Sequence, residues 1–256
     1  MIIVEKLFYC PVKSISFSYT NELFIFKNLG IKNDRVFAFT KNLNKNKSNF
    51  ILKNSKERKL NNFLTLKNKP ELNEYSFDYL EKTLIFKRNN KKILSINPKL
   101  NSDVTKICKL IETLFNIKTK INLLYDDKNP FFDTMPSNSI SLINLNSVDD
   151  FQNKINHQVE FERFRGNIYF KGVPPWEERN WINKIIKINN IPFLVQSHIS
   201  RCSATNLQPN TSNFTINLPL ELKKIYKHLD MGVYLIPLND GYIKVGDKLE
   251  LDDKIF

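Results

Sequence analysis

The chain of 256 residues contains very little alanine, glycine, cysteine and histidine. Alanine occurs only as Ala38 and Ala204, and there are six glycines, three cysteines and three histidines. Three cysteines at wide spacings form no disulfide framework, which favours a reducing, cytoplasmic setting. His157, His198 and His228 have no ligand spacing with any cysteine, so the sequence predicts no zinc site.

Several sequence patterns of common protein classes are also missing. No apolar run reaches the roughly 18 residues of a membrane helix, and the first nine residues carry charges that fit a strand better than a signal peptide. There is no glycine-rich phosphate loop, nucleophile elbow or CxxC pair. We therefore expect no membrane association and none of the enzyme classes that depend on those motifs.

The formal net charge of +13 raises the question of nucleic-acid binding. Lysines are spread from Lys6 to Lys254 among many asparagines, isoleucines and phenylalanines, as a residue-biased genome would produce. Charge without a groove-reading motif does not predict a nucleic-acid binder. Where such drift has removed most glycines, we expect the remaining six to occupy positions that tolerate no side chain.

Hydrophobic patterning predicts many short strands and few helices. Expected strands cover residues 1–9, 22–27, 35–40, 50–53, 64–67, 83–87, 92–96, 121–125, 168–170, 185–188, 192–199, 233–236 and 242–245. Expected helices cover residues 103–115, capped by Ser102 or Asp103, 147–155 and 219–229, and residues 42–49 read as a polar loop. Cys108 falls on the apolar face of the first helix, so we expect it in the core. The pattern predicts a β-rich, mixed α/β barrel with inserted helices.

Cys202 lies between Arg201 and Ser203, where an apolar strand runs out into a loop. A neighbouring cation favours the thiolate, which is the form that binds metals or attacks substrates. The residue types alone leave three interpretations open: a ligand, a nucleophile or a filler. A catalytic pair with His198 is a further alternative that depends on geometry.

Two segments of the N-terminal part offer cations to an anion. Lys13 and Ser14 follow the first strand, and their alternative is an ordinary solvated strand end. Arg35 has the fork geometry for a phosphate or carboxylate, or pairs with its neighbour Asp34.

Two segments of the C-terminal part carry further polar candidates. Asp133 lies in a stiff aromatic loop, where an acid either forms a turn or occupies a partly dry site. Arg163, Arg165 and Asn167 alternate with apolar residues, so we expect them on one face of a strand. That face is either solvated or lines an anion pocket.

In their order and spacing, these segments resemble the MOSC family, the domain related to the C-terminal part of molybdenum-cofactor sulfurases. The motifs are YCPVKS at residues 9–14, GIKNDR at 30–35, FDTMP at 132–136, RFRGNI at 163–168, Glu177, Trp181, SRCSAT at 200–205, Pro209 and GYIKVGD at 241–247. The resemblance extends over nearly the whole chain and includes the β-barrel domain that precedes MOSC. It implies an N-terminal, small β-barrel-like α/β domain over residues 1–120 and a MOSC β-barrel with inserted helices over residues 121–256. It is nearest to amidoxime-reducing component proteins and bacterial reductases of N-hydroxylated compounds.

The resemblance implies a molybdenum cofactor, a pterin whose dithiolene binds the metal, and no pyridoxal phosphate. Matched by motif, Cys202 is a metal ligand, and a soft thiolate suits such a metal. Positions that match contacts to the pterin and its phosphate are Lys13, Ser14, Arg35, Arg165 and Asn167, with Thr134, Ser200 and Arg201 as further contacts. Asp133 matches an acid near the metal, and our hypothesis is that it supplies or relays a proton.

The implied activity is a two-electron reduction of N-hydroxylated compounds or N-oxides to the amine or amidine and water. The chain lacks the clustered cysteines of an iron–sulfur centre, so electrons would come from a separate ferredoxin- or cytochrome-like protein and its reductase. Two alternatives remain: a cofactor or sulfur carrier without turnover, with a persulfide on Cys202, and a basic nucleic-acid binder with a decayed site.

Overall fold

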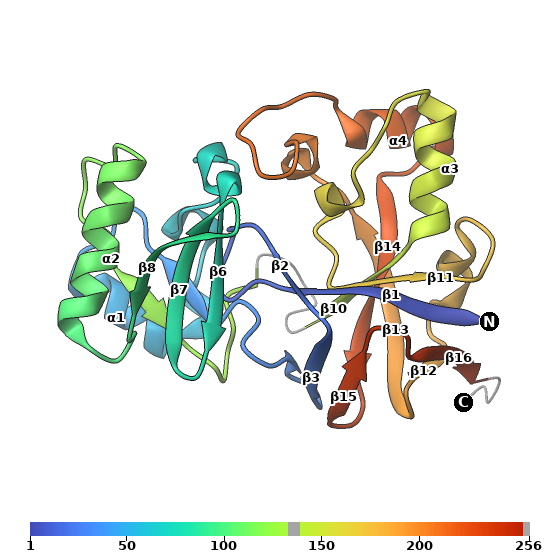
Figure 1. The fold of residues 1–256 in the computed structure, drawn as a ribbon, viewed down its shortest axis with the longest axis horizontal. Coiled ribbons are helices and arrows are strands. Elements are labelled where there is room, and N and C mark those ends of the chain that lie inside the picture. Colours follow the sequence, from blue (N-terminus) through green and yellow to red (C-terminus); the bar gives the residue numbers. More distant parts are fainter. Residues whose placement is uncertain (133–138, 253–256) are drawn as a thin grey trace.

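The computed structural model describes residues 1–132 and 139–252 and shows two lobes side by side (Figure 1). The right-hand lobe is a closed seven-stranded β-barrel in the order β1-β11-β10-β14-β13-β12-β16, with β16 returning to β1. Its strands are β1 (Ile2–Tyr9), β10 (Ile140–Asn144), β11 (Ile168–Lys171), β12 (Ile185–Ile188), β13 (Ile191–Ser200), β14 (Asp230–Pro237) and β16 (Lys248–Asp252). The predicted barrel with inserted helices is confirmed.

Strand β1 comes from the start of the chain, yet it completes the barrel of the C-terminal half. It pairs antiparallel with β11 and with β16, while its last residues pair with β2 (Ser18–Thr20). Inward side chains of β1, including Val4 and Leu7, join one buried cluster with residues of all the other barrel strands. The predicted division at residues 120 and 121 stays a prediction, but β1 itself belongs to the barrel.

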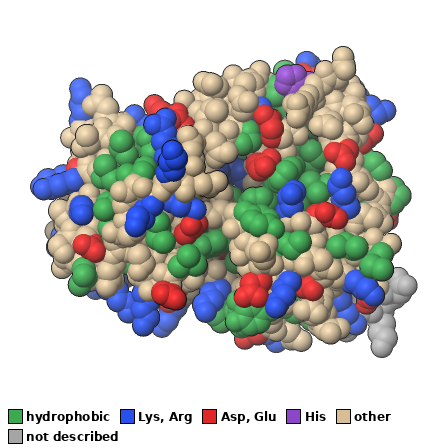
Figure 2. Space-filling model, in the orientation of Figure 1, with side chains coloured by type: hydrophobic (Ala, Val, Ile, Leu, Met, Phe, Trp, Pro, Cys, Tyr) green, Lys and Arg blue, Asp and Glu red, His purple; other side chains and the backbone are tan. Residues whose placement is uncertain are grey.

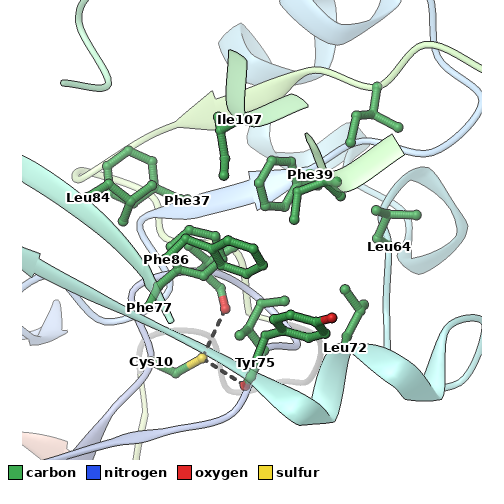
Figure 3. Close-up of a cluster of buried hydrophobic side chains, with 14 of the residues drawn as sticks. Cys10, Phe37, Phe39, Leu64, Leu72, Tyr75, Phe77, Leu84, Phe86 and Ile107 are labelled. Atoms are coloured by element: carbon green, nitrogen blue, oxygen red, sulfur yellow. Dashed lines mark hydrogen bonds between the residues drawn. The ribbon is translucent and has the colours of Figure 1, made fainter. Parts of the chain in front are cut away.

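The left-hand lobe holds two small sheets and two helices (Figure 1). Its elements are β5 (Phe37–Phe39) paired with β9 (Leu123–Tyr125), the sheet β6 (Tyr75–Leu80), β7 (Thr83–Arg88) and β8 (Lys91–Ile96), and helices α1 (Lys45–Lys53) and α2 (Asn101–Leu114). Figure 3 shows its aromatic core, in which Phe77 and Phe86 pack beside Tyr75. Cys108 is buried in this core, as expected.

The remaining elements connect and cover these two bodies. They are β3 (Glu22–Phe26), β4 (Gly30–Ile31) and β15 (Gly241–Lys244), which form a third small sheet, helices α3 (Leu145–Ile155) and α4 (Leu218–Tyr226) on the barrel, and short 3-10 turns η1 (Ser55–Glu57), η2 (Leu60–Asn62), η3 (Pro70–Glu74), η4 (Phe161–Phe164), η5 (Glu177–Trp181) and η6 (Ser203–Asn206). The surface is hollowed where the two lobes meet (Figure 2). None of the helices within residues 1–132 or 139–252 has the length and apolarity to cross a membrane.

Three local expectations were wrong in the left-hand lobe. Residues 50–53, expected as a strand, end helix α1, which begins inside the expected polar loop because the Asn44 side chain accepts a hydrogen bond from the Lys47 N–H. Residues 64–66 are buried and Lys67 is exposed, but none of the four belongs to a strand. Helix α2 begins at Asn101 without a side-chain cap, and the Asp103 carboxylate accepts a bond from the Asn97 N–H instead.

At two of the six glycines, the structure shows why a side chain is excluded. Gly172 has φ +111° and a Cβ would lie 2.2 Å from the Met1 carbonyl oxygen, while at Gly232, with φ +80°, it would lie 2.5 Å from that of Leu142. Most other left-handed positions in the described chain are asparagine, the residue that tolerates this conformation best after glycine. Asparagine therefore occupies most left-handed positions where a side chain fits, although Gly246, with φ +91°, has nothing within 4 Å of a Cβ.

Candidate functional site

A cavity of about 360 Å³ lies between the N-terminal loops and the open end of strands β13 and β14. Residues from seven separate chain segments line it, and they include every described residue predicted from the MOSC motifs to contact the cofactor or metal: Lys13, Ser14, Arg35, Arg165, Asn167, Ser200, Arg201 and Cys202. The fold thus brings together residues up to 189 positions apart in the sequence, from Lys13 to Cys202. Asp133 and Thr134 lie outside the described residues, so their roles stay predictions.

Three of these residues have left-handed backbone conformations. Ser14, Arg35 and Arg165 have φ of 62°, 56° and 49°. Such angles are uncommon for residues other than glycine and asparagine, and they persist where the surrounding structure enforces them. Here they turn three side chains of separate segments toward one cavity.

Lys13 is a buried cation with fixed contacts. Its side chain is 4% exposed, its Nζ donates to the Phe131 carbonyl over 3.1 Å, and it lies 5.5 Å from the centre of the Phe63 ring. Its backbone N–H bonds the Phe37 carbonyl on β5. The solvated strand end considered from the sequence does not apply to this lysine.

Asp34 is a buried carboxylate that joins three segments beside the cavity. Its carboxylate accepts bonds from the Cys10 N–H at 2.7 Å, from Arg35 and, at 3.5 Å, from the Asn167 side chain. Burial raises the pKa of Asp34, while Arg35 and these N–H groups act in the opposite direction. The pairing of Arg35 with Asp34 that we considered from the sequence is present, and Arg35 lines the cavity as well.

The side chain of Asn167 makes all of its hydrogen bonds within the protein. Its Nδ2 donates to the Phe8 carbonyl and Asp34, and its Oδ1 accepts from the N–H and the hydroxyl of Ser141. Two donors and two acceptor sites are the full capacity of an amide. Asn167 therefore holds strand β1, the Asp34 carboxylate and β10 together beside the cavity.

Arg201 is a partly buried cation whose guanidinium donates to main-chain oxygens. Its Nε donates to the Met231 carbonyl at 2.9 Å and its Nη1 to the Phe164 carbonyl at 2.7 Å. Burial lowers the pKa of Arg201. Because carbonyls carry no net charge, this guanidinium favours an anion on the cavity side.

Cys202 is the exposed thiol among three free cysteines. It precedes η6, and its carbonyl accepts the Thr205 N–H and hydroxyl at 3.0 Å and 2.8 Å. Cys10, in contrast, turns its thiol toward the Val12 and Ile15 carbonyls at the edge of the core (Figure 3). Burial raises the pKa of the Cys10 thiol and that of Cys108, the latter to about 11. Of the three cysteines, Cys202 is thus the accessible one, and it lines the cavity.

The charge of the cavity wall is one-sided. Five basic residues line it, Lys13, Arg35, Lys67, Arg165 and Arg201, and the described lining residues include no aspartate or glutamate. Several convergent donors of this kind are what a phosphate-bearing ligand requires.

Other lining residues were not predicted as contacts, although Phe132 and Thr205 belong to the FDTMP and SRCSAT motifs. Tyr234, Ser139, Ser141, Thr205 and Phe132 belong to this wall, and the Arg35 guanidinium lies 5.0 Å from the centre of the Phe132 ring. Small hydroxyl residues and single aromatics are common throughout the chain, so only the fold distinguishes these from the rest.

One expectation about the site was wrong, and the alternative of a Cys202–His198 pair finds no support. Arg163 and Arg165 do not share a strand face with Asn167, because residues 161–164 form η4 and β11 begins only at Ile168. Arg163 bonds Glu160 and the Asn206 carbonyl and lines a different cavity. The His198 ring bonds the Arg179 carbonyl and does not line the cavity of Cys202.

That second cavity is larger, at about 660 Å³, and adjoins the first. It lies between sheet β6-β7, strand β2 and η4, and both cavities are lined by Arg165 and Ala204. Among the residues that the structure describes, no group of three or more histidine, cysteine or acidic side chains is placed to hold a metal ion.

Comparison with known families concerns the barrel half. Residues 132–250 match the model of the MOSC domain. This part of the chain is therefore similar to MOSC domains. It contains Cys202, Arg201, Arg165 and Asn167 of the cavity wall, while Lys13, Ser14 and Arg35 reach the same cavity from the N-terminal part.

Two curated relatives are similar to part of the chain. They are mitochondrial amidoxime-reducing component 1 of Homo sapiens, 28% identical over 153 residues, and that of Mus musculus, 26% identical over 146 residues. The alignments cover 55% and 52% of this chain, but only 42% and 40% of the relatives' own length.

Two solved structures align with the chain. The YuaD protein of Bacillus subtilis aligns over 98% of this chain and 96% of its own with a TM-score of 0.46 and 11% identity. YiiM of Geobacillus stearothermophilus aligns over 44% of this chain and 54% of its own with a TM-score of 0.36 and 18% identity.

Proposed function

We propose that this protein is a molybdenum-cofactor-dependent oxidoreductase that reduces N-hydroxylated compounds or N-oxides with electrons from a separate donor protein. The observation that carries the proposal is the cavity lined by Cys202, which combines an accessible thiol with five basic residues and no described acid. The similarity to amidoxime-reducing components supports the choice of substrate class.

The residues present fit such a cofactor. Cys202 offers a soft thiolate to the metal, and Lys13, Arg35, Arg165 and Arg201 offer charged donors to a phosphate and a pterin. The partly buried guanidinium of Arg201 favours an anion because its hydrogen bonds go to uncharged carbonyls. Asn167 has no unused hydrogen-bonding capacity in its side chain, so we assign it the role of positioning β1 and Asp34 rather than direct contact.

The bound cofactor would supply the redox chemistry, in which an N–OH group takes up two electrons and two protons and yields N–H and water. The chain's own contribution is to orient the cofactor through its phosphate, to present Cys202 at the cavity, and to hold the cations in place through Asp34 and Asn167. We expect Asp133 to supply or relay a proton, as its motif position implies.

The decisive experiment measures molybdenum and oxidised, fluorescent pterin in protein expressed with ample cofactor. We expect both near one equivalent, and dithionite-driven reduction of benzamidoxime to benzamidine. Cys202→Ser should lower bound molybdenum by more than about tenfold, since even residues that only support metal ligands contribute that much. Cys108→Ala, which removes a core thiol, is the matched control and should retain the metal.

Three results would change the proposal. Protein that binds neither molybdenum nor pterin contradicts it, and equal metal in Cys202→Ser removes the ligand role. Protein that binds both but reduces no N-hydroxylated compound fits the second candidate, a cofactor or sulfur carrier, which the accessible Cys202 thiol also suits.

A further inference from the structure

Positive charge is concentrated in one short stretch of the left-hand lobe, residues 41–69, which we call the basic segment. It holds nine lysines and arginines and a single acid, Glu57, so that 29 residues carry a net charge of +8 out of the +13 of the whole chain. Six of its lysines are exposed: Lys45, Lys47, Lys53, Lys56, Lys59 and Lys67. Scattered compositional drift does not account for this local excess.

The basic segment forms one wall of the cavity that holds Cys202. Leu60, Thr65, Leu66 and Lys67, near its C-terminal end, all line that cavity. A molecule bound on the segment would therefore lie at the mouth of the candidate site.

Arg58 fixes helix α1 to the same wall. Its guanidinium donates to the Ile51 and Leu52 carbonyls at 3.0 Å each, which satisfies the C-terminal end of α1. The same guanidinium pairs with Asp126 and lies 4.3 Å from the centre of the Phe131 ring, a cavity-lining residue. The exposed lysines of α1 are thus held in a fixed relation to the site.

Exposed apolar side chains lie among these lysines. Phe50 on α1 is 56% exposed and Leu60 at η2 is 41% exposed. Apolar anchors within a charged surface are the composition of a protein interface, whereas a face that binds only phosphate backbones needs no apolar anchor.

We propose that the basic segment is the docking surface for a small acidic electron-carrier protein that reduces the site. This inference rests on the proposed function and specifies its electron donor by charge and by position. Opposite charge steers such a partner to the segment and raises the association rate. Two encounters with a one-electron carrier supply the two electrons that one N–OH requires, two protons come from water, and the carrier is left oxidised.

The test measures binding without turnover. Fluorescently labelled plant-type [2Fe–2S] ferredoxin, an acidic carrier, is titrated with the protein at about 20 and about 200 mM salt. We expect binding at low salt that weakens about tenfold or more at high salt. The triple variant Lys45→Glu, Lys47→Glu, Lys53→Glu should weaken low-salt binding by a similar factor.

The matched control reverses three exposed lysines on and beside another nine-residue helix, α4: Lys223→Glu, Lys224→Glu and Lys227→Glu. It changes the net charge by the same amount and should leave ferredoxin binding unchanged. Circular dichroism of both variants confirms that each is folded.

Four outcomes overturn the docking proposal: no ferredoxin binding at low salt, equal losses in the two triple variants, equal binding of basic cytochrome c, or tighter binding of a DNA duplex than of ferredoxin at physiological salt. The last assigns the segment to nucleic acid. Failure of the docking proposal can be distinguished from failure of the proposed function. Benzamidoxime reduction with dithionite needs no carrier, and ferredoxin binding needs no molybdenum.

Discussion

Two adjoining cavities lie where the lobes meet, and they differ more in charge than in size. The larger one, of about 660 Å³, is lined by both acids and bases, and most of these form ion pairs, as Asp78 does with Lys87 at 2.6 Å and Arg163 with Glu160 at 2.6 Å. The smaller one, of about 360 Å³, is lined by five basic residues and no described acid.

Because of this difference, choosing the ligand site by volume alone would select the wrong cavity. A balanced wall is satisfied by its own ion pairs and needs no ligand charge. A wall with an excess of cations, one of them the partly buried Arg201 on carbonyl oxygens, favours an anion from outside. Arg165 and Ala204 line both cavities, so the two environments share part of their walls.

The largest contrast that we predict is in the stability that each cavity's ion pair contributes. Asp34→Asn should lower the free energy of unfolding by about 3 kcal/mol, because it leaves Arg35 without its buried carboxylate. Asp78→Asn in the larger cavity should cost less than about 1 kcal/mol, because its side chain is 21% exposed against 2% for Asp34. Urea denaturation of both variants measures the difference.

Equal losses of unfolding free energy in the two variants would show that the Asp34–Arg35 pair stabilises the fold no more than a partly exposed ion pair does. A larger loss in Asp78→Asn would place the organising acid in the other cavity and reverse the comparison.

The second contrast concerns cofactor retention. Arg201→Gln should lower the pterin retained after gel filtration by about 10- to 100-fold, the value of roughly 1.5–3 kcal/mol for a hydrogen bond to a charged group. Arg163→Gln is its counterpart, since Arg163 is buried and also donates to a carbonyl, that of Asn206. It should retain the pterin, because it lines only the larger cavity.

Thermal unfolding of both variants separates loss of ligand from loss of fold. Should Arg201→Gln fail to fold, Arg165→Gln removes another cation of the same wall. Full pterin retention in a folded variant of either residue would contradict the assignment of the smaller cavity as the anion site.

Sequence reasoning reached the barrel because its strands obey simple local rules. Residues 185–188 and 192–199 alternate or run apolar, and strands β12 and β13 follow them closely. The resemblance also selected eight described residues that the fold brings to one cavity. Order and spacing along the chain carried that selection, since each short motif alone is weak.

Other features could not be read from local pattern. The alternation of residues 163–167 imitates a strand, but Arg165 has a left-handed backbone that ends η4, and no side-chain period encodes that angle. The three contacts of Asp34 join segments 24 and 133 positions apart. Helix α1 was missed because an asparagine- and lysine-rich composition resembles a loop when its few buried residues are not known.

The smallest predicted contrast is the reactivity of a thiol in each cavity. It tests the charge of the two cavity walls most directly. The ratio of the iodoacetate rate to the iodoacetamide rate should be several-fold higher at Cys202 than at a free thiol, because the basic wall concentrates the anionic reagent. Cys10 and Cys108 should stay unlabelled in the folded protein, since burial raises the pKa of both thiols. Peptide mass spectrometry after timed labelling measures each site.

The matched thiol belongs in the larger cavity, at Leu80→Cys in a Cys202→Ser background, because Leu80 lines that cavity and is 56% exposed. Its ratio of iodoacetate to iodoacetamide rates should stay near that of a free thiol. Added phosphate should lower the ratio at Cys202 and leave that at Leu80→Cys unchanged, because phosphate competes only where cations converge. Equal ratios at the two positions would mean that the excess of basic residues on the smaller cavity creates no anion-attracting potential at Cys202, and the charge argument for the site would fall.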